Sequence, residues 1–217
     1  MQSYSLPDGD HKQPMDYKLN DLFQNKTGGF YIELGANDGL TQSNTALFEF
    51  SKDWTGLLIE PSVNAYNQCK VNRPKSVVVN YACVSSSYTE SHVSGDFHGH
   101  LMSSVNGQRR NSGTRHQIPA RTLESLLDEH APNASIDLLS LDTEGYELHI
   151  LQGLNLSKYR PHYMLIEVYT KDYDAICAFL QEHGYALHSN FSNYTKENHP
   201  PWDGTHNDYL FVDTKHM

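Results

Sequence analysis

The feature that most restricts the fold of this chain is a regular alternation of short apolar segments with longer amphipathic ones. Short apolar runs are typical of buried strands, whereas the segments between them repeat with the period of a helix. The runs lie at 30–34, 57–59, 77–81, 136–141, 163–166, 185–188 and 209–212. Strands that alternate with helices predict an α/β fold of the Rossmann-like type, with a mainly parallel sheet and helices on both faces.

Residues suited to helix ends support this pattern. Ser62 and Thr122 each precede an amphipathic segment and are expected to act as N-caps. A further helix is expected from Ser43 to Phe50, and Gly184 suits the end of a helix over 174–183. The last two apolar runs are expected to pair antiparallel at the edge of the sheet.

The length of 217 residues suits one α/β domain. We expect residues 1–27 to form an N-terminal arm or leading helix and residues 28–217 to form the domain. Residues 85–117 are rich in Ser, Gly, His and Asn, and they predict a long polar loop that could act as a lid.

Composition excludes several classes of protein. The net charge of −10 disfavours nucleic acid as the main partner, because nucleic-acid-binding proteins usually present a basic face. The cysteines form no CxxC pair, which argues against a structural zinc site. No apolar run is long enough to span a membrane, and no signal-peptide core is seen, so we expect a cytoplasmic protein. The sequence does not indicate an oligomeric state.

Carboxylates follow four of the predicted strands. They are Glu33, Glu60, Asp142 and Glu167. A single one could be an ordinary solvated loop residue. The carboxyl ends of parallel strands meet at one edge of a sheet, where ligands bind in this type of fold. Four successive carboxylates at that edge therefore predict a binding site.

Residues 33–39, at the end of the first predicted strand, indicate which class of ligand the site could bind. It lacks the G-x-G-x-x-G pattern of dinucleotide-binding turns. Glu33 would oppose a pyrophosphate but would suit a ligand with sulfonium and ammonium groups. Glu60 is placed to accept hydrogen bonds from both hydroxyls of a ribose. These residues favour a positively charged adenosyl cofactor over NAD, and a nicotinamide-dependent oxidoreductase is the weaker alternative.

The chain resembles the FkbM family of methyltransferases over roughly residues 28–168. The stretches that carry the resemblance are Glu33-Leu34-Gly35-Ala36-Asn37-Asp38-Gly39, Gln42-Ser43-Asn44-Thr45, 54–61, Asn72-Arg73, 118–123, 136–147 and Glu167. The resemblance implies a class I methyltransferase fold with seven strands, the last antiparallel. It also implies S-adenosylmethionine as the methyl donor.

The resemblance further implies which residues contact the cofactor. The expected set is Glu33, Gly35, Ala36, Asn37, Gly39, Ser43, Asn44, Glu60, Pro61, Cys83 and Asp142. Gly35, Ala36 and Asn37 should lie under the methionine part, and Cys83 should border the adenine. Ser43 or Asn44 could contact the cofactor carboxylate at a helix N-terminus, although Ser43 could equally serve as a helix cap only.

Methyl transfer to an alcohol requires an aligned nucleophile and a group that removes its proton. Asp142, Glu144 and Glu167 are the main candidates, and Glu144 could instead stabilise a helix dipole. His98 and His100 in the polar loop are candidate bases on a lid, or ordinary surface residues. A divalent metal held by Asp142 and Glu167 with a loop histidine is an alternative arrangement.

The expected function is O-methylation of a hydroxyl on a small polar acceptor, with a sugar or glycan favoured. The acceptor class follows from the family resemblance, and the polar loop agrees with it. One alternative is a hydroxyl of a natural product or a lipid-linked compound, for which the pocket should be largely apolar. Another is an adenosyl-binding module without catalytic activity.

Overall fold

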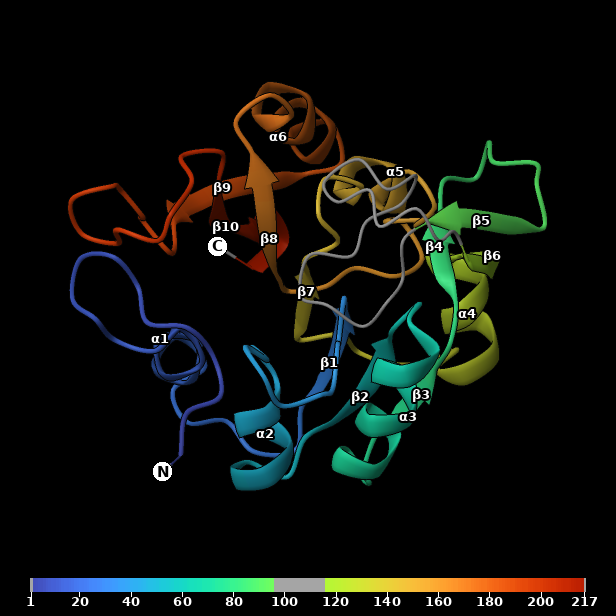
Figure 1. Cartoon of the computed structure of the whole chain (residues 1–217), viewed down its shortest axis with the longest axis horizontal. Coiled ribbons are helices and arrows are strands. Elements are labelled where there is room, and N and C mark those ends of the chain that lie inside the picture. The colour runs from blue at the N-terminus through green and yellow to red at the C-terminus, as the bar shows by residue number, and fades with distance from the viewer. Residues whose placement is uncertain (1, 96–115, 217) are drawn as a thin grey trace.

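The computed structural model describes residues 2–95 and 116–216. Its main feature is a seven-stranded sheet in the order β3-β2-β1-β7-β8-β10-β9 (Figure 1). The strands are β1 (Phe30–Leu34), β2 (Thr55–Ile59), β3 (Val77–Val79), β7 (Leu138–Leu141), β8 (Tyr163–Tyr169), β9 (Tyr185–Asn190) and β10 (His206–Asp213).

The pairing of the strands confirms the predicted fold class. β1 pairs in parallel with β2 and β7, while β2 pairs with β3 and β7 pairs with β8 in the same sense. β10 lies between β8 and β9 and is antiparallel to both. The last strand is therefore the reversed one, and the last two apolar runs do pair antiparallel, as the sequence predicts.

Helices cover both faces of the sheet because strand residues alternate in direction. Ile32 and Leu34 pack in a core with α4, α5 and α6, whereas Tyr31 and Leu58 pack on the opposite face with α1, α2 and α3. The helices are α1 (Met15–Leu22), α2 (Ala46–Ser51), α3 (Val63–Asn72), α4 (Leu123–His130), α5 (Glu147–Leu151), α6 (Tyr173–Glu182) and the 3-10 turn η1 (Thr214–His216).

Three of the predicted helix ends are confirmed. The Ser62 hydroxyl accepts from the Ala65 amide at 3.5 Å, and Thr122 caps α4 in the same way. Gly184 follows α6 with a φ of +79°. The predicted start of a helix at Ser43 is wrong: α2 begins three residues later, because the Ser43 hydroxyl is directed to a buried carboxylate in the site described below.

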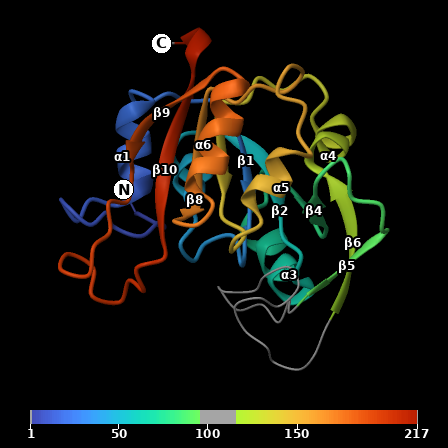
Figure 2. The same ribbon diagram turned by 90° about the horizontal axis from the view of Figure 1, so that it is seen from above.

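The structure describes only the two ends of segment 85–117, which the sequence predicts to be a long polar loop and possible lid. A second sheet in the order β4-β6-β5 includes part of this segment, with β4 at Ala82–Val84, β5 at His92–Gly95 and β6 at His116–Thr122 (Figure 2). Val93 and Ile118 are buried in a small core of their own, which gives the polar segment enough apolar contact to form strands. His98 and His100 lie outside the described residues.

The N-terminal segment packs against the residues that follow β9. The Gly9 amide donates to the Ser192 carbonyl at 2.7 Å, and the Tyr194 hydroxyl donates to the Pro7 carbonyl at 3.0 Å. Helix α1 is buried through Met15 and Leu19, in the same core as β1 and β2. Within the described ranges, no helix has the length and apolar character that a membrane span requires.

Candidate functional site

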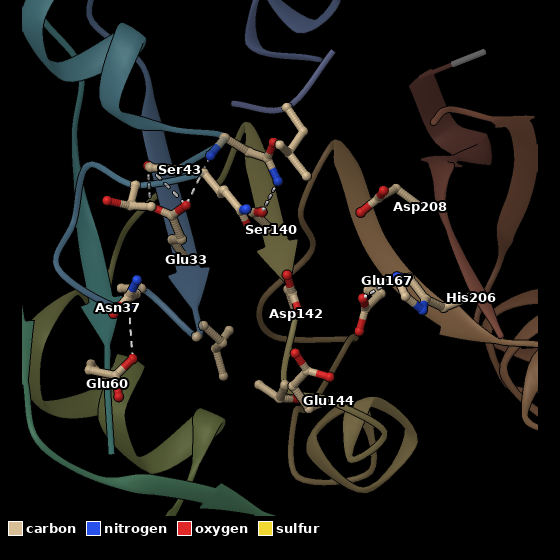
Figure 3. A pocket seen from close by; sticks show the side chains of 18 of the residues that line it. Glu33, Asn37, Ser43, Glu60, Ser140, Asp142, Glu144, Glu167, His206 and Asp208 are labelled. Atoms are coloured by element: carbon tan, nitrogen blue, oxygen red, sulfur yellow. Dashed lines mark hydrogen bonds and ion pairs between the residues drawn. The ribbon is translucent and has the colours of Figure 1, made fainter. Parts of the chain in front are cut away.

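A cavity of about 460 Å³ lies at the carboxyl ends of the parallel strands, where the sequence predicted a site. It extends from Glu60 after β2, past Asp142 after β7, to Asp208 on β10 (Figure 3). Other lining residues come from outside the sheet, namely Leu6, Met15, Tyr194, His199, Pro201, Trp202 and Asp203. This volume is within the range of small-molecule and cofactor sites.

The turn after β1 brings two strand ends very close together. Gly35 has a φ of +77°, and a Cβ built on it would lie 1.9 Å from the backbone oxygen of Asp142. No residue with a side chain could occupy this position without moving β1 and β7 apart. Asn37 follows with a φ of +48°, a conformation that Asn tolerates better than most residues. The turn therefore exposes backbone to the cavity.

Glu60 is buried beside this turn, with 6% of its surface exposed. One carboxylate oxygen accepts from the Asn37 amide at 2.8 Å and the other from the Ser62 amide at 2.7 Å. Burial raises the pKa of Glu60 to about 7, although both hydrogen bonds act in the opposite direction. Each oxygen has a second lone pair, so the carboxylate can accept two further hydrogen bonds from a ligand.

Glu33 is held by an arginine that the sequence analysis gave no role. Arg73 is fully buried, and its guanidinium lies 3.3 Å from Glu33 and 3.0 Å from Glu49. Glu33 also accepts from the hydroxyls of Ser43 at 3.0 Å and Thr45 at 2.6 Å. Both oxygens of Glu33 are thus engaged within the protein, and Arg73 compensates its charge.

Asn44 presents an unsatisfied acceptor at the cavity. Its side-chain nitrogen donates to the Ser140 hydroxyl at 3.2 Å, and its backbone amide donates to Glu33. The side-chain oxygen Oδ1 is buried and has no donor among the residues that the structure describes. A buried acceptor without a donor is unfavourable, so this atom is suited to a ligand that brings a hydrogen-bond donor.

Asp142 and Glu167 form a coupled pair of carboxyl groups. Burial raises the pKa of Asp142 well above its ordinary value, and the nearby charges of Glu144 and Asp208 add to the effect. Burial and then the charge of Asp142 do the same for Glu167. Each carboxyl group is thus both buried and close to other negative charge. Burial and mutual repulsion therefore raise the affinity of this pair for a proton.

The turn after β7 places Glu144 beside this pair. Its backbone has a φ of +60°, and its carboxylate accepts from the Tyr169 hydroxyl at 2.8 Å. Glu147 is buried below the turn and accepts from the Thr143 amide at 2.8 Å and the Gly145 amide at 3.1 Å. Glu147 therefore fixes the turn, and Glu144 is directed to the cavity instead of the helix axis.

Among the residues of the cavity that the sequence analysis missed are the ionisable side chains of His199, Asp203, His206 and Asp208. His206 lies 3.2 Å from Glu167 and 3.5 Å from Asp203. Asp208 stands opposite Glu167 in the β10–β8 pairing, and burial raises its pKa to about 6. One sequence signal could have identified His206 and Asp208. They precede the apolar run at 209–212 and alternate with the period of a strand, which places them on the same face as Leu210.

Most of the predicted site residues line this cavity. Those that do are Glu33, Gly35, Ala36, Asn37, Ser43, Asn44, Glu60, Pro61, Cys83, Asp142, Glu144 and Glu167. Gly39 does not line it, because a Cβ there would meet Arg73 at 2.7 Å and Cys69 at 2.9 Å, so this glycine makes room for the buried arginine. Within residues 2–95 and 116–216, no group of three or more His, Cys, Asp or Glu side chains is arranged to hold a metal ion.

The described lining of the cavity offers many acceptors and little positive charge. Seven carboxyl groups line it, namely Glu33, Glu60, Asp142, Glu144, Glu167, Asp203 and Asp208, while the described lining contains no lysine or arginine. The Oδ1 atom of Asn44 lacks a donor. Such a cavity suits a ligand with sulfonium, ammonium and ribose hydroxyl groups, and it opposes a pyrophosphate.

A sequence model of the methyltransferase FkbM domain matches residues 33–187. The chain belongs to the FkbM methyltransferase family. This membership confirms the predicted family and, with it, S-adenosylmethionine as the predicted cofactor. The match ends before the strand that carries His206 and Asp208. A comparison with curated proteins gave no significant match.

Solved structures support the fold of this FkbM-family chain. The precorrin-6y C5,15-methyltransferase of Geobacter metallireducens is similar with a TM-score of 0.52 and 9% identity, over 93% of this chain and 90% of that one. The TrmK protein of M. capricolum, solved with S-adenosyl-homocysteine, gives a TM-score of 0.50 and 9% identity, over 91% of this chain and 68% of that one. Identities this low establish the fold only, so the acceptor, the location and the predicted lack of nucleic-acid binding stay predictions.

Proposed function

We propose that this FkbM-family methyltransferase transfers a methyl group to a hydroxyl oxygen of a small polar acceptor of the sugar or glycan class. The observation that carries this proposal is the buried Asp142–Glu167 pair of carboxyl groups, which lies in the cavity beside the turn at Gly35. An alcohol is a weak nucleophile, and its methylation is assisted by a base with a pKa near the working pH. The pair meets this requirement because burial and mutual repulsion raise its affinity for a proton.

The residues around Gly35 would hold S-adenosylmethionine. Glu60 would accept hydrogen bonds from the ribose hydroxyls, and Cys83 would border the adenine. The exposed backbone of the turn at Gly35 and the orphan oxygen of Asn44 would contact the methionine part. The role of Glu33 is indirect in this arrangement, because its carboxylate is already engaged by Arg73 and by the hydroxyls of Ser43 and Thr45.

When bound, S-adenosylmethionine supplies an electrophilic methyl group, whose bond to sulfur breaks as its bond to the acceptor oxygen forms, leaving a neutral thioether. The hydroxyl proton passes to the Asp142–Glu167 pair. Glu144 supports the pair's high proton affinity through its charge, and Tyr169 orients Glu144. His206 contacts Glu167 on the side away from Asp142 and is placed to take the proton onwards.

The test combines methyl transfer with cofactor binding. The wild type and an Asp142→Asn variant are incubated with isotopically labelled S-adenosylmethionine and a panel of mono- and disaccharides, and products are identified by mass spectrometry and NMR. We expect O-methylated sugar with the wild type and at least a hundredfold lower turnover with the variant, the scale of a lost general base. Calorimetry with S-adenosylhomocysteine should still detect binding to both proteins, because Glu60 and the turn at Gly35 are unchanged in the variant.

Two results would contradict the proposal. Full activity of the Asp142→Asn variant would remove this carboxylate from proton transfer. Tight binding of S-adenosylhomocysteine without transfer to any hydroxyl in the panel would instead indicate an adenosyl-binding module or a different nucleophile.

A further inference from the structure

The end of the cavity farthest from Glu60 carries an excess of negative charge. Glu167 from β8 and Asp208 from β10 lie directly opposite each other in the antiparallel pairing, so their side chains share one face of the sheet (Figure 3). Asp203, in the segment before β10, also lines this end. Like charges placed opposite each other on neighbouring strands are destabilising, so a stable protein needs a reason to keep them.

Buried acceptors in this cavity lack donors. Glu167 is 7% exposed and receives His206 on one oxygen, while its second oxygen, Oε2, has no donor among the described residues when both carboxyls are ionised. Asn44 is also 7% exposed, and its Oδ1 atom has no donor in the same part of the chain. Both side chains line the cavity. The ligands of this cavity must therefore bring hydrogen-bond donors and positive charge.

The cofactor satisfies only part of this requirement. The ribose of the cofactor is expected at Glu60, at the opposite end of the cavity. The cofactor carries a sulfonium, an ammonium and a carboxylate group, so its net charge is one positive charge. That charge is best placed near Asp142, beside Gly35. The carboxyl groups of the cavity then still outnumber its cations, because the basic side chains in the described lining are His199 and His206 alone.

Trp202 lies between Pro201 and Asp203 in the lining of the same end. The face of an indole ring attracts a cation, and a cation removed from water gains more from it than an exposed one does. A carboxylate pair beside a tryptophan is thus suited to an organic ammonium group. A bare metal ion is less suited, because the described residues contain no three-ligand group.

We propose that the acceptor carries a protonated amine next to the hydroxyl that is methylated, and that Asp208 and Glu167 bind this amine while Trp202 covers it. Amino sugars have this chemistry. The inference rests on the proposed O-methyl transfer and specifies its substrate class. The amine itself is not methylated, because an ammonium nitrogen held by carboxylates has no free electron pair.

The experiment measures binding and transfer separately at pH 7. Protein saturated with S-adenosylhomocysteine is titrated calorimetrically with glucosamine, galactosamine and mannosamine, and with the parent neutral sugars and the N-acetylated sugars as matched compounds. We expect at least one amino sugar to bind tenfold or more tightly than its neutral and acetylated counterparts. Asp208→Asn should abolish that preference and leave the affinity for S-adenosylhomocysteine unchanged within about threefold.

Asp53→Asn is the matched control, because Asp53 is exposed and paired with Lys75 on the surface. This variant changes the net charge equally and should keep the preference. Equal binding of amino and neutral sugars, or an Asp208→Asn variant that keeps the preference, would overturn the inference. Methyl transfer to neutral sugars in that case would leave the proposed function intact. N-methylated product would overturn the assignment of the amine as an anchor.

Discussion

The stability of this protein should fall as Glu60 ionises. The pKa of Glu60 is raised by burial from 4.5 to about 7, so the folded protein binds this proton more tightly than the unfolded chain does. Stability from the protonated group is fully present below pH 4.5 and is lost as the pH rises through 7. At pH 5, two units below the folded pKa, the proton contributes about 2–3 kcal/mol, and at pH 8 almost nothing.

A Glu60→Gln variant isolates this contribution because glutamine does not titrate. Its amide should lower stability by a constant amount, since an NH2 group would face the Asn37 or Ser62 amide, but that amount does not depend on pH. The free energy of unfolding of the wild type minus that of the variant should therefore be about 2–3 kcal/mol larger at pH 5 than at pH 8. For a chain of this size the corresponding change in the difference of melting temperatures is about 5–10 °C.

The assay is urea unfolding followed by circular dichroism at several pH values between 5 and 8, with a variant of the exposed Glu90, Glu90→Gln, as control. The pKa of Glu60 is raised by burial against two backbone hydrogen bonds, and no charged side chain is among its causes, so titration of Asp142 and Glu167 should cancel in the difference. If wild type and Glu60→Gln gave parallel stability curves across this range, the raised pKa of this buried carboxyl would be refuted.

Two further perturbations test the packing around the cofactor-binding turn. Arg73→Met should lower the free energy of unfolding by about 3–5 kcal/mol, because it leaves Glu33 and Glu49 buried without their cation. Urea unfolding at pH 7 measures this loss. A change below about 1 kcal/mol would contradict the stabilising role of the Arg73 ion pairs. Gly35→Ala should abolish calorimetric binding of S-adenosylhomocysteine and lower the melting temperature, because the new Cβ would overlap the backbone oxygen of Asp142; unchanged binding would show that β1 and β7 can move apart.

The sequence predicts the sheet and one end of the cavity well, for identifiable reasons. The parallel strands are buried on both faces and are therefore mostly apolar, and Ser62 and Thr122 are helix caps whose effect is local. The carboxylates after the strands could be grouped because strand order fixes which ends meet. Such features need no knowledge of side-chain contacts.

Features that depend on distant contacts were not predictable. Arginine side chains are usually exposed, and the burial of Arg73 depends on its contacts with Glu33 and Glu49, which are distant in the sequence. His206 and Asp208 are polar residues at the start of β10. They can lie there because they line the cavity, whereas an ordinary apolar core would not accommodate them. The strand at His92–Gly95 likewise forms only because a partner strand covers it.

The boundary of the family match divides the residues that line the cavity into two groups. Residues 33–187 include the turn at Gly35, Glu60 and the Asp142–Glu167 pair, whereas Leu6, Met15 and the lining residues between 194 and 208 fall outside them. The segment before α1 and the segment after β9 are hydrogen-bonded to each other, and both contribute to this second group. Since the proposed acceptor end of the cavity depends on both segments, grafting both from a relative should transfer acceptor choice where grafting either alone should not.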